Sequence, residues 1–138
     1  HIGSIFLWIL RYWNSKNMDL TITSSVSNDL LEKIQQVLDY ITEHFSEEIT
    51  ASDAAAMCNV SYSYFSRIFK QMTKHSFSEY INYVRITEAE KLLASTDMTM
   101  TEIAMRTGFS TSSYFIQQFK LQKRISPKQF RKNLLGEL

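Results

Sequence analysis

The sequence predicts an all-α protein, in which two helix-turn-helix units are joined by one long connecting helix, with about seven helices in total. Three observations lead to this prediction: an internal duplication, pairs of helix-capping residues at matching places in both copies, and an uninterrupted apolar helical period between the copies. A chain of 138 residues can form one ordinary domain or two very small ones. We therefore expect two small lobes and no strands.

The duplication relates residues 50–70 to residues 99–120. The residues that recur 49 positions later are Thr50, Asp53, Ala55, Asn59 and Ser61, which return as Thr99, Glu102, Ala104, Gly108 and Ser110. After one inserted residue, Tyr64, Phe65, Phe69 and Lys70 recur 50 positions later. A repeated supersecondary unit is the simplest explanation.

Each copy carries the boundary signals of two short helices. The pairs with capping-box spacing are Thr50 with Asp53 and Thr99 with Glu102. Asn59 and Gly108 follow, and these residue types best tolerate the left-handed backbone that ends a helix. Ser61 and Ser110 then offer an N-cap for a second helix. A short helix, a tight turn and a longer helix make a helix-turn-helix.

The second helix of each copy is amphipathic when its residues are placed at about 100° each. Its predicted inward residues are Phe65, Ile68, Phe69 and Met72 in the first copy, and Phe115 and Phe119 in the second. Its predicted outward residues are Ser63, Arg67, Lys70 and Lys74 in the first copy, and Ser113, Gln117, Lys120 and Arg124 in the second. One basic outer stripe alone is typical of a solvated face, but matched stripes in both copies favour a shared binding role.

A connecting helix is predicted over residues 77–95, where apolar residues recur at helical spacing without Pro or Gly. Its length would be about 28 Å, comparable with the about 34 Å between successive major-groove openings of B-DNA. Helices over residues 29–45 and 127–135 should complete the two cores. Pro127 suits the first turn of the last one.

The chain from about residue 30 to 132 resembles the DNA-binding domain of AraC/XylS-family bacterial transcription regulators. The resemblance rests on three blocks: EYINYVRITEAEKLL (79–93), IAMRTGFSTSSYFIQQFK (103–120) and ISPKQFRK (125–132). It implies two homeodomain-like three-helix units whose recognition helices enter successive major grooves. It also implies a transcription regulator, most often an activator, that works with RNA polymerase. Its domain would span residues 29–138, with lobe one at 29–76, the connecting helix at 77–95 and lobe two at 96–135.

The resemblance also assigns candidate contacts to the bases of double-stranded DNA. These are Tyr62, Ser63, Ser66 and Arg67 in lobe one, and Thr111, Ser112, Ser113, Ile116 and Gln117 in lobe two. By chemistry, Arg67 suits guanine O6 and N7, and Gln117 suits adenine N6 and N7. The candidate phosphate contacts are Ser61, Lys70, Lys74, Ser110, Lys120, Arg124 and Lys128. The alternative for each is a surface residue that touches nothing.

The sequence departs from the family pattern after each recognition helix, where a Gly is usual. Lys74 and Arg124 stand there instead, and holding a non-Gly residue in a left-handed cap costs about 1 kcal/mol. Those turns are therefore expected to be strained or differently shaped, with two additional phosphate contacts as the gain. Gln117 also replaces a long basic residue, so weaker base reading is expected in lobe two.

The net charge of +1 hides a strong polarity. Residues 1–60 hold three Lys or Arg and eight Asp or Glu, a net −5, whereas residues 61–138 hold twelve and six, a net +6. From Lys120 to Lys132 there are six basic residues and no acidic one. Such a patch makes binding to nucleic acid steeply salt-dependent.

The first 13 residues are too apolar for an exposed tail and too short for a membrane span, which needs about 20. They also lack the basic start and cleavage site of a signal peptide. We interpret residues 1–13 as the end of a preceding sensor or dimerisation domain, and residues 14–28 as a linker. A homodimer could then form through residues 2–13 or through a missing N-terminal domain. The alternative is a cloning remnant or a stray helix folded onto lobe one.

Enzyme chemistry finds little support in the sequence. Cys58 is the only cysteine, which excludes an internal disulfide and fits the cytoplasm. It has no predicted His partner, the histidines lack metal-ligand spacing, and no Gly-rich phosphate loop is present. We therefore expect no cofactor, no membrane association and sequence-specific DNA binding. The alternatives are a helix-turn-helix scaffold that acts through protein contacts and a small helical enzyme.

Overall fold

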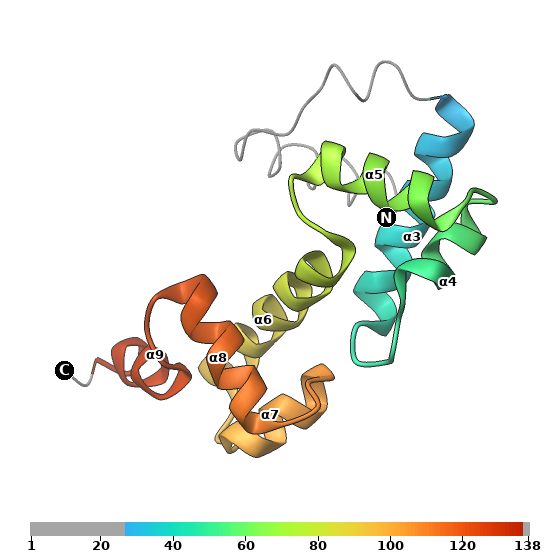
Figure 1. Ribbon diagram of the computed structural model, residues 1–138. Coiled ribbons are helices and arrows are strands. Elements are labelled where there is room, and N and C mark those ends of the chain that lie inside the picture. The colour runs from blue at the N-terminus through green and yellow to red at the C-terminus, as the bar shows by residue number, and fades with distance from the viewer. Residues whose placement is uncertain (1–26, 137–138) are drawn as a thin grey trace. The chain divides into compact units, whose positions relative to one another are not determined.

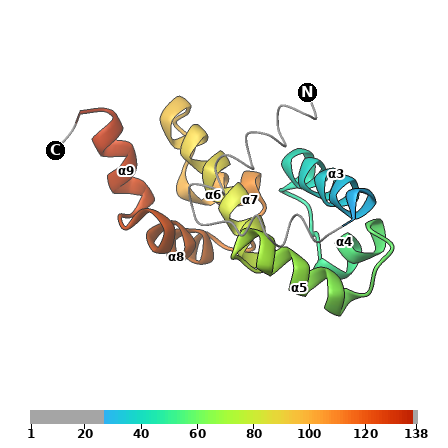
Figure 2. The ribbon, with the colours of Figure 1, turned by 90° about the horizontal axis from the view of Figure 1, so that it is seen from above.

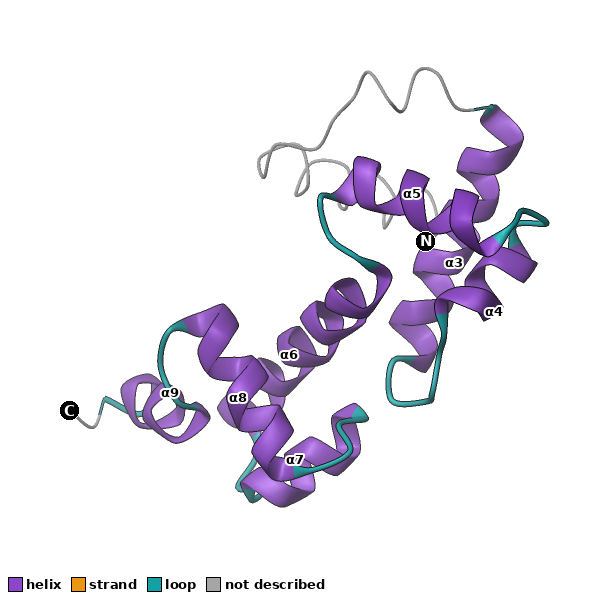
Figure 3. Cartoon of the chain, in the orientation of Figure 1, coloured by secondary structure: helices purple, strands orange, loops and turns teal. Residues whose placement is uncertain are grey.

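The computed structural model describes residues 27–136, so the predictions for residues 1–13 and most of the linker fall outside the described part. This part is all-helical, with seven helices and no strand, as the sequence predicts (Figure 3). It divides into two compact units. Unit 1 comprises residues 27–44 and 49–80, and unit 2 comprises residues 45–48 and 81–136.

Unit 1 is built from three helices and the first turn of a fourth (Figures 1 and 2). These are α3 (Asn28–His44), α4 (Ala51–Met57), α5 (Tyr62–Thr73) and the start of α6 (Phe77–Ser95). Helix α3 ends one residue before its predicted end, and the residues that follow it, 45–48, belong to unit 2. The core centres on an aromatic cluster in which the Phe69 ring lies 5.5 Å from the rings of both Phe77 and Tyr80. These edge-to-face contacts join α5 to α6.

The predicted caps of unit 1 are confirmed. The Thr50 hydroxyl accepts from the Asp53 N–H at 3.1 Å, and the Asp53 carboxylate accepts from the Thr50 N–H at 3.1 Å. Asn59 is left-handed with φ 56°. The Ser61 hydroxyl accepts from the Tyr64 N–H at 3.1 Å and so starts α5. The turn between α4 and α5 is therefore fixed by local hydrogen bonds.

Unit 2 contains the rest of α6, followed by α7 (Met100–Thr107), α8 (Ser112–Lys123) and α9 (Pro127–Leu134). Its buried core consists of Ile86, Ala89, Leu93, Ile103, Ala104, Phe109, Phe115 and Phe119. Helix α6 has the predicted bounds, whereas α9 ends one residue early. Helix α6 thus supplies its first turn to unit 1 and its remaining turns to unit 2.

The prediction that Ser110 caps the second helix of the second repeat, α8, is wrong. Thr111 is the N-cap, and its hydroxyl accepts from the Tyr114 N–H at 3.0 Å. The inserted residue, Ser110, lies between Phe109, which is 3% exposed and part of the unit 2 core, and the Thr111 cap. The 50-residue offset therefore already holds between Ser61 and Thr111.

The capping box predicted at the start of α7 forms only in part. The Thr99 hydroxyl accepts from the Glu102 N–H at 3.1 Å, as expected. The Glu102 carboxylate, however, accepts from the Thr99 hydroxyl at 3.1 Å rather than from its backbone N–H. The start of α7 thus has one backbone donor fewer satisfied by this pair than the start of α4.

A close approach between two backbone segments explains the glycine at position 108. Gly108 has φ 97°, and a Cβ there would lie 2.7 Å from Ser46 Cα and 2.9 Å from Ser46 O. Arg85 holds the facing segment, because its Nε donates to the Phe45 carbonyl at 2.7 Å and its Nη2 to the Glu47 carbonyl at 3.0 Å. Residues 45–48 are thereby fixed against the α7–α8 turn within unit 2.

Replacing Gly108 by Ala should lower the free energy of unfolding by about 2–4 kcal/mol, through left-handed strain together with backbone overpacking. Urea unfolding followed by circular dichroism measures the change. Gly136→Ala is the matched control, since Gly136 has φ 76° but nothing within 4 Å of an added Cβ. An equal loss in both variants would show that the close approach to Ser46 is unimportant.

Candidate nucleic-acid interface

The outward face of α5 is polar and basic, as the sequence predicts. Ser63, Arg67, Lys70 and Lys74 are all exposed. Phe65 and Phe69, on the opposite face, are each 1% exposed and form the core of unit 1. The helix is therefore anchored by its aromatic side, and its basic side is available to a partner.

The predicted base-contact residues of α5 differ in accessibility. Tyr62 is 57% exposed at the first position of the helix, and Ser63 is exposed one residue later. Ser66 is only half-buried, so its hydroxyl remains within reach of solvent. The guanidinium of Arg67 lies over the ring of Tyr64, with its carbon 5.1 Å from the ring centroid. These side chains present hydroxyl, phenol and guanidinium groups, which can hydrogen-bond to base edges.

The outward face of α8 repeats this arrangement with fewer charges. Ser113, Gln117, Lys120 and Arg124 are exposed, while Phe115 and Phe119 are fully buried. The other predicted contacts are less free: Ile116 is half-buried against the unit 2 core, Ser112 is half-buried, and the Thr111 hydroxyl is engaged as the helix cap. Ser113 and Gln117 are thus the best-presented polar groups of α8.

Helices α5 and α8 both end in a left-handed basic residue. Lys74 has φ 64° and Arg124 has φ 69°, and their N–H groups donate to Lys70 O at 2.8 Å and Lys120 O at 2.9 Å. The strain predicted from the missing glycines is therefore present at both turns. Positive charge at a helix C-terminus is favoured by the helix dipole, which offsets part of this cost.

Side chains of α6 hold α8 in place, a feature that the sequence pattern did not predict. Asn82 Nδ2 donates to Tyr114 Oη at 3.0 Å and to Gln118 Oε1 at 3.4 Å. Further along, Lys123 Nζ pairs with Glu90 Oε1 at 2.6 Å. The helix is thus tied to α6 near both of its ends. No local sequence pattern marks these pairs, because the partners lie more than 30 residues apart.

The remaining predicted phosphate contacts lie at helix starts. Ser61 and Ser110 are both exposed, although the Ser61 hydroxyl already accepts the Tyr64 N–H. Lys128 is exposed in the first turn of α9, which Ser126 caps by accepting the Gln129 N–H at 3.1 Å. Exposed backbone N–H groups and a lysine at such a position can meet a phosphate.

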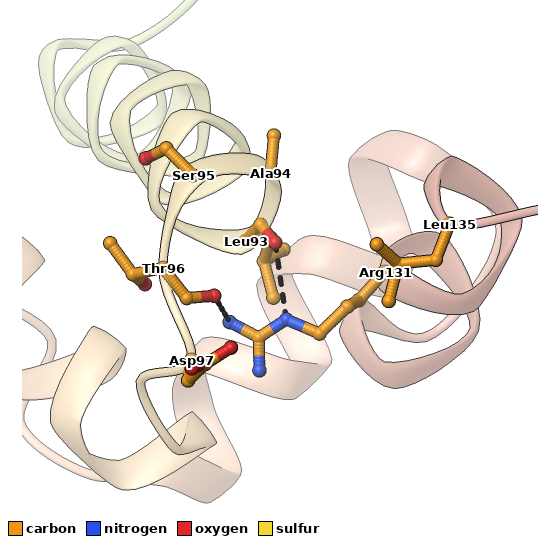
Figure 4. A pocket seen from close by; sticks show the side chains of 7 residues that line it. All are labelled: Leu93, Ala94, Ser95, Thr96, Asp97, Arg131 and Leu135. Carbon is orange, nitrogen blue, oxygen red and sulfur yellow. Dashed lines mark hydrogen bonds between the residues drawn. The ribbon is translucent and has the colours of Figure 1, made fainter.

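A cavity of about 220 Å³ in unit 2 is lined mainly by the end of α6 and by Arg131 and Leu135 (Figure 4). The Arg131 guanidinium is already hydrogen-bonded within the protein. It donates to Leu93 O at 3.1 Å, Thr96 O at 3.1 Å and Met98 O at 2.8 Å. Leu93 lies in the last turn of α6, where carbonyls lack helical partners, and Thr96 and Met98 lie in the segment that follows the helix. Arg131 therefore acts as a structural cap for α6, and the cavity presents no free cationic group from it.

Cys58 is a buried core residue of unit 1. Its side chain is 2% exposed, and burial raises the pKa of the Cys58 thiol, which disfavours the reactive thiolate. Within residues 27–136 no group of three or more His, Cys, Asp or Glu side chains could hold a metal ion. The helices of this same part are also too short or too polar to cross a membrane.

Two helix-turn-helix units with exposed basic second helices define the chain as a helix-turn-helix DNA-binding domain. A helix-turn-helix domain family of the AraC/XylS type matches residues 54–133, and the chain belongs to this family. The sequence-based identification of the family and of the all-α fold is thereby confirmed.

Relatives and solved structures agree with this assignment. An uncharacterized HTH-type transcriptional regulator of Staphylococcus aureus is 36% identical over 107 residues, which are 78% of this chain but 14% of that protein. The C-terminal domain of AraT, a response regulator from Geobacillus stearothermophilus, superposes with a TM-score of 0.67 at 36% identity, covering 78% of this chain and 86% of that one. The DNA-binding domain of AdpA, a global transcriptional factor solved with a target DNA, gives 0.69 at 25% identity, covering 80% and 96%.

Replacing Lys74 or Arg124 by Gly should raise the free energy of unfolding by about 0.5–1 kcal/mol, because relief of left-handed strain exceeds the added unfolded-state entropy. Thermal and urea unfolding measure the gain. The matched controls are Lys70→Gly and Lys120→Gly, one turn earlier on the same exposed faces. Because glycine is unfavourable inside a helix, each control should lower the free energy of unfolding by about 1 kcal/mol. A lower free energy of unfolding in Lys74→Gly and Arg124→Gly would show that these two turns are not strained.

Proposed function

We propose that this chain binds double-stranded DNA sequence-specifically as part of a transcription regulator, with α5 and α8 as its two recognition helices. The observation that carries the proposal is the matched pair of exposed polar and basic faces, each on the second helix of a helix-turn-helix. Each helix would enter one major-groove segment, and the two segments would be successive. In this geometry the second helix meets base edges while neighbouring groups hold the phosphates.

The long side chains at the centre of each exposed face would form the direct hydrogen bonds to the bases. Arg67 offers two parallel donors, which match guanine O6 and N7. Gln117 offers one donor and one acceptor, which match adenine N7 and N6. Tyr62, Ser63 and Ser66 in unit 1, and Thr111, Ser112, Ser113 and Ile116 in unit 2, would complete the contacts around them.

Phosphate contacts would fix the position of each helix without reading sequence. The side chains assigned to this role are Ser61, Lys70, Lys74, Ser110, Lys120, Arg124 and Lys128. Lys74 and Arg124 suit it especially, because each extends the exposed basic face beyond the last helical residue. The DNA complex of AdpA supports double-stranded DNA as the partner class.

We propose that this chain carries the DNA-binding units of a longer regulator. The chain spans only 14% of the length of the staphylococcal relatives that it matches. We propose that the full regulator is an activator that works with RNA polymerase. It would dimerise through residues 2–13 or through a domain that lies outside this chain.

Selection of bound duplexes from a randomised pool tests sequence specificity. The parent chain should enrich two short motifs about one helical turn apart. Arg67→Ala should relax one motif and Gln117→Ala the other, each with a loss of about 5- to 150-fold in discrimination at one base pair. Binding without any enriched motif would leave only a basic patch. Motifs unchanged in both variants would instead move base reading to other side chains.

The salt dependence of binding separates phosphate contacts from base contacts. Lys74→Asn keeps a residue that tolerates the left-handed turn but removes the charge, so the slope of log K against log salt should shrink by about one. Affinity should fall about equally for all sequences. Fluorescence anisotropy from about 50 to 200 mM salt measures both. Lys91→Gln, which removes the charge of an exposed lysine on α6, is the control and should leave the slope unchanged.

A further inference from the structure

We propose that Tyr64 is a positioning residue that presents the Arg67 guanidinium to a base in the major groove. This inference rests on the proposed function, because it concerns the same recognition helix. Tyr64 stands outside the set of base and phosphate contacts assigned above. Its role would be to act through Arg67 rather than to touch DNA.

The contact between the two side chains is a cation–π pair on the exposed surface of α5. Arg67 lies three residues after Tyr64, which places both on neighbouring turns of one face. The guanidinium carbon is 5.1 Å from the ring centroid, within the range of an attractive interaction. The structure records no hydrogen bond or ion pair for Arg67 with any residue between 27 and 136. The ring is therefore the group in this part of the chain that restrains the guanidinium.

The chemistry of this pair leaves the base-reading atoms free. A guanidinium stacks through its flat face, whereas its N–H donors lie in its plane and point outward from its edge. An arginine held on an aromatic ring can therefore still form two parallel hydrogen bonds to guanine. Because an unrestrained arginine loses much rotamer freedom when it binds, holding it beforehand lowers the cost of recognition.

The second repeat shows the same tyrosine put to a different use. Tyr114 occupies the position that matches Tyr64, and the residue three positions later is Gln117 in place of Arg67. With no cation to hold, the Tyr114 hydroxyl accepts a hydrogen bond from Asn82 at 3.0 Å and helps to fix α8. The exposed fractions of the two tyrosines are nearly equal, at 36% and 38%. The ring is thus paired with the arginine only in the copy that has one.

A double-mutant cycle on the duplex enriched by the parent chain tests the inference. Tyr64→Leu should weaken binding by about two- to fivefold, and should reduce the preference for guanine at the base pair that Arg67→Ala relaxes. Tyr64→Phe keeps the ring and should bind within about twofold of the parent. In the Arg67→Ala background, Tyr64→Leu should have no further effect. Tyr40→Leu, at an exposed tyrosine of α3, is the matched control and should bind like the parent.

Each contrary outcome has a distinct meaning. An equal loss from Tyr64→Leu with and without Arg67 would show that the tyrosine touches DNA itself and would overturn the inference. A loss in Tyr64→Phe as large as in Tyr64→Leu would overturn it too, since the hydroxyl would then be the active group. If the parent enriches no motif, the proposed function fails first. The contact itself can then be tested without DNA, as an upfield ring-current shift of the Arg67 side-chain protons that Tyr64→Leu abolishes.

Discussion

The placement of α5 and of α8 depends on one interaction, the burial of two phenylalanines spaced four residues apart. Phe65 and Phe69 serve α5, Phe115 and Phe119 serve α8, and none is more than 1% exposed. Residues four apart share one face of a helix, so two buried rings fix its rotation about its own axis. Large aromatic side chains dominate the energy of a small core. The outward direction of the polar side chains follows from this anchoring and from nothing in those side chains themselves.

Strain and charge are combined at the ends of the same helices. A glycine would suit the left-handed backbone at positions 74 and 124, yet both positions hold long cations. The backbone cost of about 1 kcal/mol each is a large fraction of what a small lobe can spare. The favourable interaction of a cation with the helix C-terminus returns part of it in the free protein. Lys74 and Arg124 therefore lower the stability of the protein at two positions that lie next to the basic faces of α5 and α8.

Periodicity and capping chemistry predicted nearly all of the described helices, because these signals are local. The bounds of α6 follow from an apolar period without Gly or Pro, and the start of α5 from one serine hydroxyl. The start of α8 was predicted one residue too early, because Ser110 and Thr111 can both cap a helix and the repeat alone does not show on which side of the cap the inserted residue lies. The roles of Asn82, Arg85 and Arg131 were missed for another reason. Their partners lie 32 to 40 residues away, and most are carbonyls that every residue carries.

The Arg85 clamp on residues 45–48 determines which changes this segment can accept. Its two hydrogen bonds end on the main-chain carbonyls of Phe45 and Glu47, so the clamp does not depend on which side chains those positions bear. The spacing of the two carbonyls, by contrast, must match the fork of a single guanidinium. Substitutions within residues 45–48 would thus leave both hydrogen bonds possible, whereas an insertion or deletion there would shift one carbonyl out of reach.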